Sequence, residues 1–196
     1  TAYRKFVEAY PTSRHLAPAH EALARLELSA GNFETAQREL NELAKLPGSA
    51  DRAAVLKSTI LTKQGKYEES ITELDRLITR FPKNSPERRQ AQLAKAQSLA
   101  GLKRFDQAET IVRELIKANP PEDSAVQAPA YNTLGDCMRE ANRPKDALIA
   151  YLHTDLLYDK NKEEHARALF QISRTFRQLK QDSRAQEIWQ RLKQEY

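Results

Sequence analysis

The sequence predicts an all-α fold, an α-solenoid of antiparallel helix pairs, on the basis of three observations. The chain of 196 residues has only five glycines, 30% charged side chains and many residues that favour helices. A short polar turn recurs five times along it. Small residues recur at two fixed positions around this turn. A period of 34 residues or slightly more indicates repeated units that stack to bury a common apolar face.

The repeated turn joins two helices in each unit. It occupies residues 31–36, 65–70, 103–108, 142–147 and 180–185. In the first copy, apolar residues at helical spacing lie before the turn (Leu23, Leu26, Ala30) and after it (Phe33, Ala36, Leu40, Leu43). Two helices joined by so short a turn lie antiparallel and share one apolar seam. We therefore expect each unit to consist of a helix A, a turn and a helix B.

Helix-ending signals divide the chain into five units and one single helix. Proline follows Tyr10, Phe81 and Asn119, and Pro47-Gly48 ends the first unit. The predicted bounds are 1–11 for an unpaired helix B, then 14–48, 50–82, 86–120, 124–160 and 162–196 for five units of one array. Because the chain lacks an initiator Met, we expect it to be part of a longer protein.

The small residues mark the places where helices approach most closely. One set lies in the first turn of helix B: Ala36, Ser70, Ala108, Ala147 and Ala185. The other lies inside helix A: Ala24, Ser58, Ala96, Gly135 and Ser173. A larger side chain at either position would push the helices apart, which a close-packed core tolerates poorly. These ten residues therefore predict helix–helix contacts.

The later A helices are predicted to begin about one turn earlier than the first two. The helix B small residue advances by 34, then 38, 39 and 38 residues, and four extra residues are close to one helical turn. Ser85-Pro86-Glu87 has the pattern of a capped helix start, and Asn161 with Glu164 has capping-box spacing. In the fourth unit, a start at Ser124 would place Pro129 inside the helix. That helix either kinks or begins near Ala128 after a longer loop.

These units resemble tetratricopeptide (TPR) repeats over nearly the whole chain. One of the best copies combines Tyr131 and Gly135 of helix A with Ala147 of helix B. The family's early aromatic residue is present only as Tyr131, and its turn glycine only as Gly31 and Gly65. The resemblance implies a right-handed α-solenoid that acts as a protein-interaction scaffold.

Two junctions give a narrower resemblance. Tyr10-Pro-Thr-Ser13 and Phe81-Pro-Lys-Asn-Ser85 are similar to the aromatic-Pro-x-Ser junctions of bacterial envelope TPR proteins, such as the barrel-assembly lipoproteins and the Tol–Pal accessory factors. This similarity implies a bacterial protein of the periplasm or cell envelope, with the cytoplasm as the alternative location.

The TPR resemblance implies that a partner binds the concave side, at helix A positions that packing does not use. In units four and five these positions are Asn132, Asp136, Arg139, Phe170, Arg174 and Arg177. On each helix three of them share a face at i, i+4 and i+7. An apolar anchor beside Arg and Asn suits an extended peptide or a carboxylate. The alternative is a solvated charged face in which Phe170 fills a gap. The carboxylate clamp by which some TPR domains hold a chaperone's tail is absent from the matching positions.

A second candidate surface is basic. Between residues 76 and 104, eight basic residues against Glu87 alone give a charge of +7, while the whole chain carries +5. The candidates for a basic contact surface are Arg76, Arg80, Lys83, Arg88, Arg89 and Lys95. Such a cluster attracts nucleic acid or an anionic surface. Since it lacks interleaved aromatic residues and a nucleic-acid motif, a solvated face or a contact for an acidic protein is favoured.

Motifs for chemistry are missing from the sequence. Cys137 is the only cysteine, the four histidines lack metal-ligand spacing, and no phosphate loop or nucleophile motif is present. We therefore expect no enzyme activity, no cofactor and no metal. The longest apolar runs are also shorter than the roughly 18–20 residues that cross a bilayer.

The leading functional prediction is a scaffold that binds a peptide or protein partner on the concave face. The alternative is an accessory segment that positions other domains of a larger bacterial enzyme, or of an envelope or secretion machine; nucleic-acid binding ranks third. Both ends carry apolar residues that a neighbouring unit would cover: Tyr3, Phe6, Trp189 and Leu192. These residues predict some end-to-end self-association.

Overall fold

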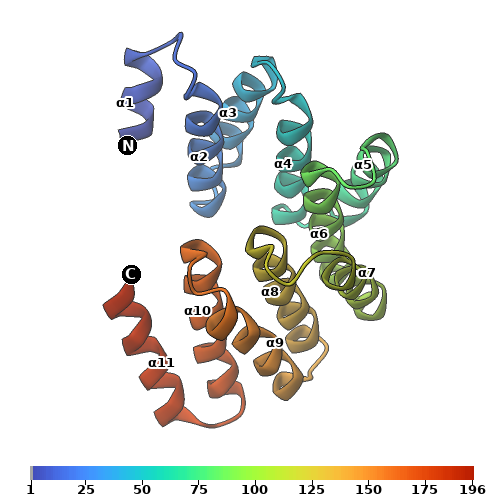
Figure 1. Ribbon diagram of the computed structural model, residues 1–196, viewed down its shortest axis with the longest axis vertical. Coiled ribbons are helices and arrows are strands. Elements are labelled where there is room, and N and C mark those ends of the chain that lie inside the picture. Colours follow the sequence, from blue (N-terminus) through green and yellow to red (C-terminus); the bar gives the residue numbers. More distant parts are fainter. Residues whose placement is uncertain (1) are drawn as a thin grey trace. The chain divides into compact units, whose positions relative to one another are not determined.

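The computed structural model describes residues 2–196, and every regular element in this range is a helix (Figure 1). The chain forms two compact units. The first ends at Ala94 and the second begins at Lys95, a boundary that falls within helix α6. Successive helices are joined by short turns, as in a stacked array. The predicted all-α solenoid is therefore confirmed.

The first unit contains five helices and the beginning of a sixth. They are α1 (Ala2–Ala9), α2 (Leu16–Ser29), α3 (Phe33–Lys45), α4 (Ala50–Lys63), α5 (Tyr67–Arg80) and α6 (Pro86–Gly101). Each helix from α1 to α4 packs on the next, and α2 also touches α4. These contacts are those of antiparallel helix pairs whose A helices lie side by side.

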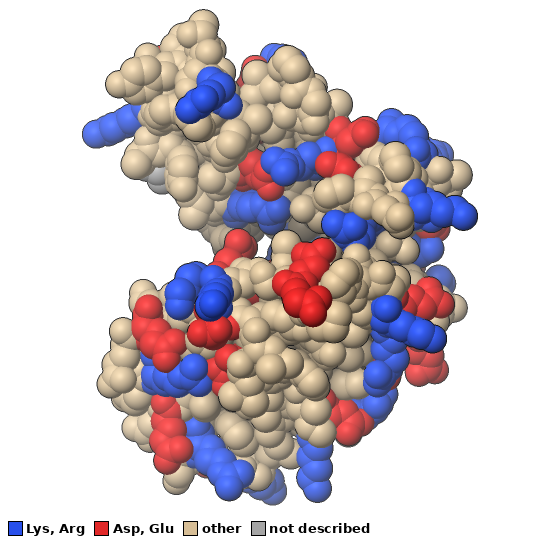
Figure 2. All heavy atoms as spheres, viewed as in Figure 1, with Lys and Arg blue, Asp and Glu red and all other residues tan. Residues whose placement is uncertain are grey.

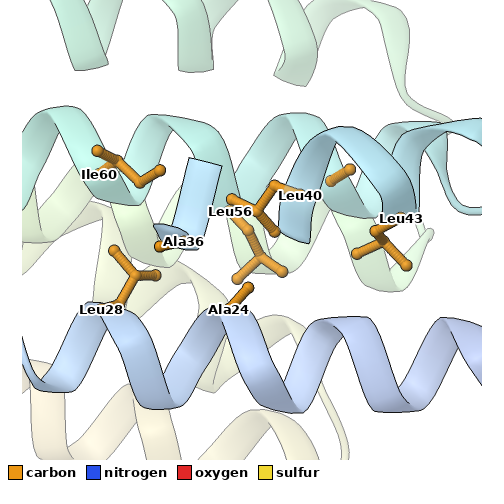
Figure 3. Close-up of a cluster of buried hydrophobic side chains, with 8 residues drawn as sticks. Ala24, Leu28, Ala36, Leu40, Leu43, Leu56 and Ile60 are labelled. Atoms are coloured by element: carbon orange, nitrogen blue, oxygen red, sulfur yellow. The ribbon is translucent and has the colours of Figure 1, made fainter. Parts of the chain in front are cut away.

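A buried apolar cluster holds the first helix pair against the next A helix (Figure 3). Its labelled side chains come from α2 (Ala24, Leu28), α3 (Ala36, Leu40, Leu43) and α4 (Leu56, Ile60). Ala24, Ala36 and Leu40 are completely inaccessible to solvent. The two predicted small residues thus lie where α2 and α3 meet, beside leucines that fill the remaining space.

The second unit contains the end of α6 and five further helices. They are α7 (Phe105–Ala118), α8 (Ser124–Glu140), α9 (Pro144–Leu157), α10 (Lys162–Gln178) and α11 (Asp182–Glu195). Each helix from α7 to α10 packs on the next, and the A helices α8 and α10 also touch. Counted over residues 2–196, the helices fall within the ranges expected for one single helix and five pairs. That the pairs form one continuous array stays a prediction.

All ten predicted small residues are buried. Two of the three serines among them donate a hydrogen bond to a backbone carbonyl of the paired helix: Ser70 to Ser58 at 3.0 Å and Ser173 to Ala185 at 2.9 Å. The third, Ser58, donates to Ala54 of its own helix at 3.3 Å. Gly135 occupies the tightest place, since a Cβ there would lie 2.5 Å from the ring of the fully buried Tyr151. The prediction that these positions mark close helix contacts is confirmed.

The later A helices are longer, as the spacing predicted. Helices α2 and α4 have 14 residues, whereas α6 has 16 and both α8 and α10 have 17. Ser85 and Asn161 accept hydrogen bonds from backbone amides three residues later, at 3.1 and 3.4 Å, so both predicted caps are present. In α8 the helix begins at Ser124 and continues through Pro129. The later start near Ala128 was the wrong alternative.

The five turns share one backbone conformation despite their different residues. Gly31 and Gly65 have φ of 79° and 77°, and the corresponding Lys103, Asn142 and Lys180 have φ of 60°, 60° and 58°. This left-handed region is free of strain for glycine and costs other residues about 1–2 kcal/mol, with Asn the most tolerant. The loss of glycine from the later turns therefore leaves their geometry intact but introduces strain.

We expect Lys180→Gly to raise the free energy of unfolding by about 0.5–1 kcal/mol, because relief of the left-handed strain outweighs glycine's extra freedom in the unfolded chain. Lys66→Gly is the control, since Lys66 lies in a turn with an ordinary φ of −86°. Denaturant unfolding measures both. Equal changes in the two variants would contradict the strain assigned to Lys180.

Candidate protein-interaction site

Helices α8 and α10 pack through polar groups that we predicted from the sequence to lie on a binding surface. The amide nitrogen of Asn132 donates to the backbone carbonyl of Glu164 at 2.8 Å and to its carboxylate at 2.7 Å. Asp136 accepts from Arg167 at 2.5 Å and from Gln171 at 3.0 Å. Asn132 has no solvent exposure at all. Asn132 and Asp136 therefore hold α8 against α10, the next A helix.

Asp136 also contacts the middle of α9. The Tyr151 hydroxyl donates to Asp136 at 2.7 Å. Burial, reinforced by the nearby Asp136 charge, raises the pKa of Tyr151, so its hydroxyl remains a proton donor at all physiological pH values. Burial opposes the charge of Arg167, but attraction to Asp136 and Glu164 raises the pKa of this guanidinium above its ordinary value. Asp136 thus joins α8 to both α9 and α10.

The other three predicted binding residues lie on α10, and all three are exposed. Phe170 is 41% exposed, and Arg174 and Arg177 are also exposed. The Phe170 ring lies against Trp189 of α11, with centroids 6.1 Å apart, and the Arg174 guanidinium lies 5.7 Å from the Phe170 centroid. We call these residues of α10 and the neighbouring Trp189 of α11 the α10 face (Phe170, Arg174, Arg177 and Trp189).

The six predicted residues thus separate into two groups. Asn132 and Asp136 contact α10, and Arg139 forms an ion pair with Glu140 while only 16% of its side chain is exposed. Phe170, Arg174 and Arg177 remain open to solvent on the α10 face. Arg174 and Arg177 have no carboxylate partner among the described residues. Of the six predicted residues, the three on α10 are therefore the ones whose side chains are exposed.

The predicted basic contact surface is largely occupied by contacts within the chain. Arg76 pairs with Glu73 at 2.7 Å, and Arg80 pairs with Asp51. Arg88 donates to the carbonyls of Ile78 and Phe81 at 2.5 and 3.1 Å, so it caps the end of α5. Arg89 likewise donates to the carbonyl of Asn84, and Lys95 also has a partner; Lys83 is exposed. Figure 2 shows acidic side chains close to basic ones on the visible face.

Sequence reasoning missed a buried polar network that joins α9, α10 and α11. Asp155 accepts from Nε2 of His165 and from Arg191, both at 2.8 Å. The Tyr196 hydroxyl lies 2.7 Å from Nδ1 of His165. With its proton on Nε2, the imidazole donates to Asp155 and accepts from Tyr196. No spacing in the sequence signals this network, because its members come from three helices.

A groove with a volume of about 440 Å³ lies between α3, α4 and α5 in the first unit. Its apolar lining includes Phe33, Leu61 and Leu77. Polar and charged side chains also line it: Glu34, Gln37, Lys57, Ser58, Gln64 and Glu73. Nothing in its lining specifies a ligand.

Cys137 is a packing residue with a suppressed thiol. It is 1% exposed, and burial together with the negative charge of Asp136 raises its pKa to about 12. The thiol is therefore protonated at physiological pH, and a protonated thiol is a poor nucleophile. Across residues 2–196 there is also no cluster of three or more His, Cys, Asp or Glu side chains with the geometry of a metal site.

At pH 8 we expect iodoacetamide to alkylate Cys137 in the native protein at least about 100-fold more slowly than in denaturant, since the site is closed and thiolate is scarce. Mass spectrometry of timed samples measures both rates. Comparable rates would contradict the burial of this thiol.

None of the helices in the described range is long and apolar enough to span a membrane. No curated protein sequence matches the chain. Among solved structures, a tetratricopeptide repeat protein from Parabacteroides merdae is similar, with a TM-score of 0.67 and 16% identity over 98% of this chain and 69% of the other. MamA from Desulfovibrio magneticus RS-1 is similar with a TM-score of 0.53 and 18% identity, over 91% of this chain and 94% of the other. At these identities the likeness concerns the fold.

Family models give the identification. One tetratricopeptide repeat model matches residues 21–85, 55–124 and 93–154, and a second matches residues 167–196. These matches cover well over half of the chain and include the turns and small residues described above. The chain belongs to the tetratricopeptide repeat family.

Proposed function

We propose that this protein is an interaction scaffold whose second unit binds a protein partner through the α10 face. An exposed phenylalanine beside a partly buried tryptophan and two arginines without a carboxylate partner has the composition typical of energetically dominant contacts in protein interfaces. The scaffold role is supported by the TPR repeats. The choice of surface is supported by a contrast between two helices. Asn132 and Asp136 of α8 make hydrogen bonds to α10, whereas the corresponding Phe170 and Arg174 of α10 are exposed to solvent.

The observation that carries the proposal is the arrangement of Phe170, Trp189 and Arg174. Phe170 is 41% exposed although it sits between two ring or cation contacts, so it is held in position while still accessible. A fixed aromatic group loses little conformational entropy when a partner covers it. The adjacent Arg174 and Arg177 would select an acidic partner.

Affinity capture from the native cell tests the proposal. We expect a protein captured by the wild-type chain to be lost, by at least about tenfold, when Phe170→Ser and Arg174→Glu are combined. Ile149→Ser combined with Lys145→Glu is the matched control, because it changes an exposed apolar residue and an exposed cation on α9. Both double variants should keep the wild-type circular dichroism spectrum. If the α10 variant captures the same proteins as the wild type, the proposed surface is wrong.

A further inference from the structure

The outer face of α9 is apolar. Ile149 and Leu156 are 60% and 73% exposed, and Leu152 lies between them with partial exposure. The three residues recur at i, i+3 and i+7, so they share one side of the helix. A helix at a protein surface normally carries polar residues on its outer side. We call Ile149, Leu152 and Leu156 the α9 stripe.

The repeats of the chain provide an internal comparison for this stripe. Counted from the small residue in the first turn of each helix B, the three corresponding positions are polar in all four other units. They hold Arg38, Asn41 and Lys45 in α3, Thr72, Asp75 and Thr79 in α5, Thr110, Arg113 and Lys117 in α7, and Glu187, Gln190 and Gln194 in α11. The packing of a helix pair therefore does not require apolar side chains there. An exposed apolar surface that the fold does not need indicates a contact with another molecule.

The exposure of the stripe does not depend on a missing neighbour in the array. Helix α9 packs on α8 and α10, and the unit that follows it in the chain is present as α10 and α11. The stripe stays exposed in the presence of both. The stacking of successive units therefore does not cover it.

The charges at the two ends of α9 complement each other in reverse order. Lys145 and Asp146 are exposed in its first turn. Asp159 and Lys160 are exposed just beyond its last turn. When a second α9 runs antiparallel, Lys145 lies near Asp159 of the second copy, and Asp146 lies near Lys160. A parallel pair would instead set like charges against each other, which disfavours it.

The same antiparallel register pairs the apolar residues. Ile149 of one copy faces Leu156 of the other, and Leu152 lies next to the centre of the pair. Lys145 and Asp159 form no ion pair with another described residue, so both are available for such a contact. A two-fold contact that uses the same residues on both copies is the commonest geometry of homodimers. A different protein would not require that the two ends of this one helix complement each other.

We propose that α9 is the contact surface of a homodimer, in which two copies of the chain pair antiparallel through the α9 stripe. The stripe supplies the apolar centre, and Lys145 and Asp159 set the orientation. This surface is distinct from the α10 face and from the chain ends, and the inference does not rest on the proposed function. Because one helix face is smaller than a standard interface, we expect a weak dimer, with a dissociation constant on the order of 10–100 μM.

Sedimentation equilibrium of the whole chain measures the dimer. We expect Ile149→Ser combined with Leu156→Ser to raise the dissociation constant at least about tenfold, because it removes the apolar centre from both copies. Leu26→Ser is the matched control, since Leu26 is an exposed leucine on α2, and it should leave the dimer unchanged. Both variants should keep the wild-type circular dichroism spectrum.

A charge exchange between two variants tests the orientation. Lys145→Glu places Glu opposite Asp159, and Asp159→Lys places Lys opposite Lys145, so each should weaken its own dimer at least about fivefold. In an equimolar mixture, one copy of each variant restores opposite charges at both ends. The mixture should therefore dimerise to within about twofold of the wild type. This rescue also shows that both variants are folded.

Cysteine cross-linking tests the register. Under mild oxidation, a mixture of Ile149→Cys and Leu156→Cys should form an intermolecular disulfide, since opposed Cα atoms of packed helices lie within the roughly 4.4–6.8 Å that the bond requires. Ile149→Cys alone should not, because its two copies lie about two helical turns apart along the antiparallel pair. The native Cys137 is buried and does not compete.

Four results would overturn the inference. A chain that stays monomeric at millimolar concentration would leave the stripe to another kind of molecule, and a dimer unaffected by the two serine substitutions would place self-association elsewhere. Failure of the charge mixture to dimerise, or cross-linking of Ile149→Cys to itself, would exclude the antiparallel pair. Ile149→Ser combined with Lys145→Glu, the control of the capture experiment, should be monomeric and still capture the protein. The dimer and the α10 face can therefore fail separately.

Discussion

Replacing Asp155 by Ala is expected to lower the free energy of unfolding by about 3 kcal/mol, the largest effect among the substitutions considered. The Asp155 side chain is 4% exposed and accepts hydrogen bonds from His165 and Arg191. Removing the Asp155 carboxylate leaves Nε2 of His165 and the Arg191 guanidinium without this acceptor. A buried polar group without its partner destabilises a fold by more than the hydrogen bond itself contributes to stability. Because these residues join α9, α10 and α11, the loss should loosen the end of the second unit.

Denaturant unfolding followed by circular dichroism measures this loss. Asp159→Ala is the control, since Asp159 is exposed and lies four residues further along the chain, in the turn after α9. Surface substitutions of this kind change stability by about 0.5 kcal/mol or less. A cost for Asp155→Ala as small as that for Asp159→Ala would show that the network does not stabilise the fold.

Gly135→Ala is expected to lower the free energy of unfolding by about 2 kcal/mol, although alanine is the better helix former. The new Cβ would lie 2.5 to 2.7 Å from three ring atoms of Tyr151. That ring cannot withdraw, because it is fully buried and its hydroxyl is bonded to Asp136. Overpacking of this kind costs about 1–3 kcal/mol, more than the roughly 1 kcal/mol gained from helix propensity.

A double-mutant cycle isolates the contact between Gly135 and Tyr151. In a Tyr151→Leu background the ring is gone, so Gly135→Ala should be neutral or stabilising by up to about 1 kcal/mol. The sign of the substitution therefore reverses between the two backgrounds. The same destabilisation in both would mean that steric conflict with Tyr151 is not the reason for glycine at this position.

The fold could be predicted from the sequence because its determinants are local and repeated. The turn, the small residues and the caps at Ser85 and Asn161 can each be recognised from a short stretch of sequence. Because the unit occurs five times, the common pattern remains recognisable even where one copy departs from it. Pro129 left two alternatives open, since local rules disfavour proline inside a helix but cannot weigh it against the packing of α8. In the structure α8 begins at Ser124 and continues through Pro129.

The candidate site could be predicted only in part. The family pattern identified Phe170, Arg174 and Arg177 as candidates, and these are exposed. The same pattern also predicted Asn132 as a binding residue. Asn132 is buried, because the early start of α10 places Glu164 over it. The network around Asp155 needs three helices at defined distances, which no single-sequence pattern encodes.

Hydrogen–deuterium exchange on the complex with a natively captured partner is the most direct test of the central claim that recognition occurs on the α10 face. Exchange reports local opening, and a docked partner slows it where it binds. We predict slower exchange in α10, over residues 162–178, and in the part of α11 around Trp189, with no change in α2 to α4. Slower exchange confined to α5 and the start of α6, with α10 unaffected, would contradict the account and move recognition to the basic contact surface.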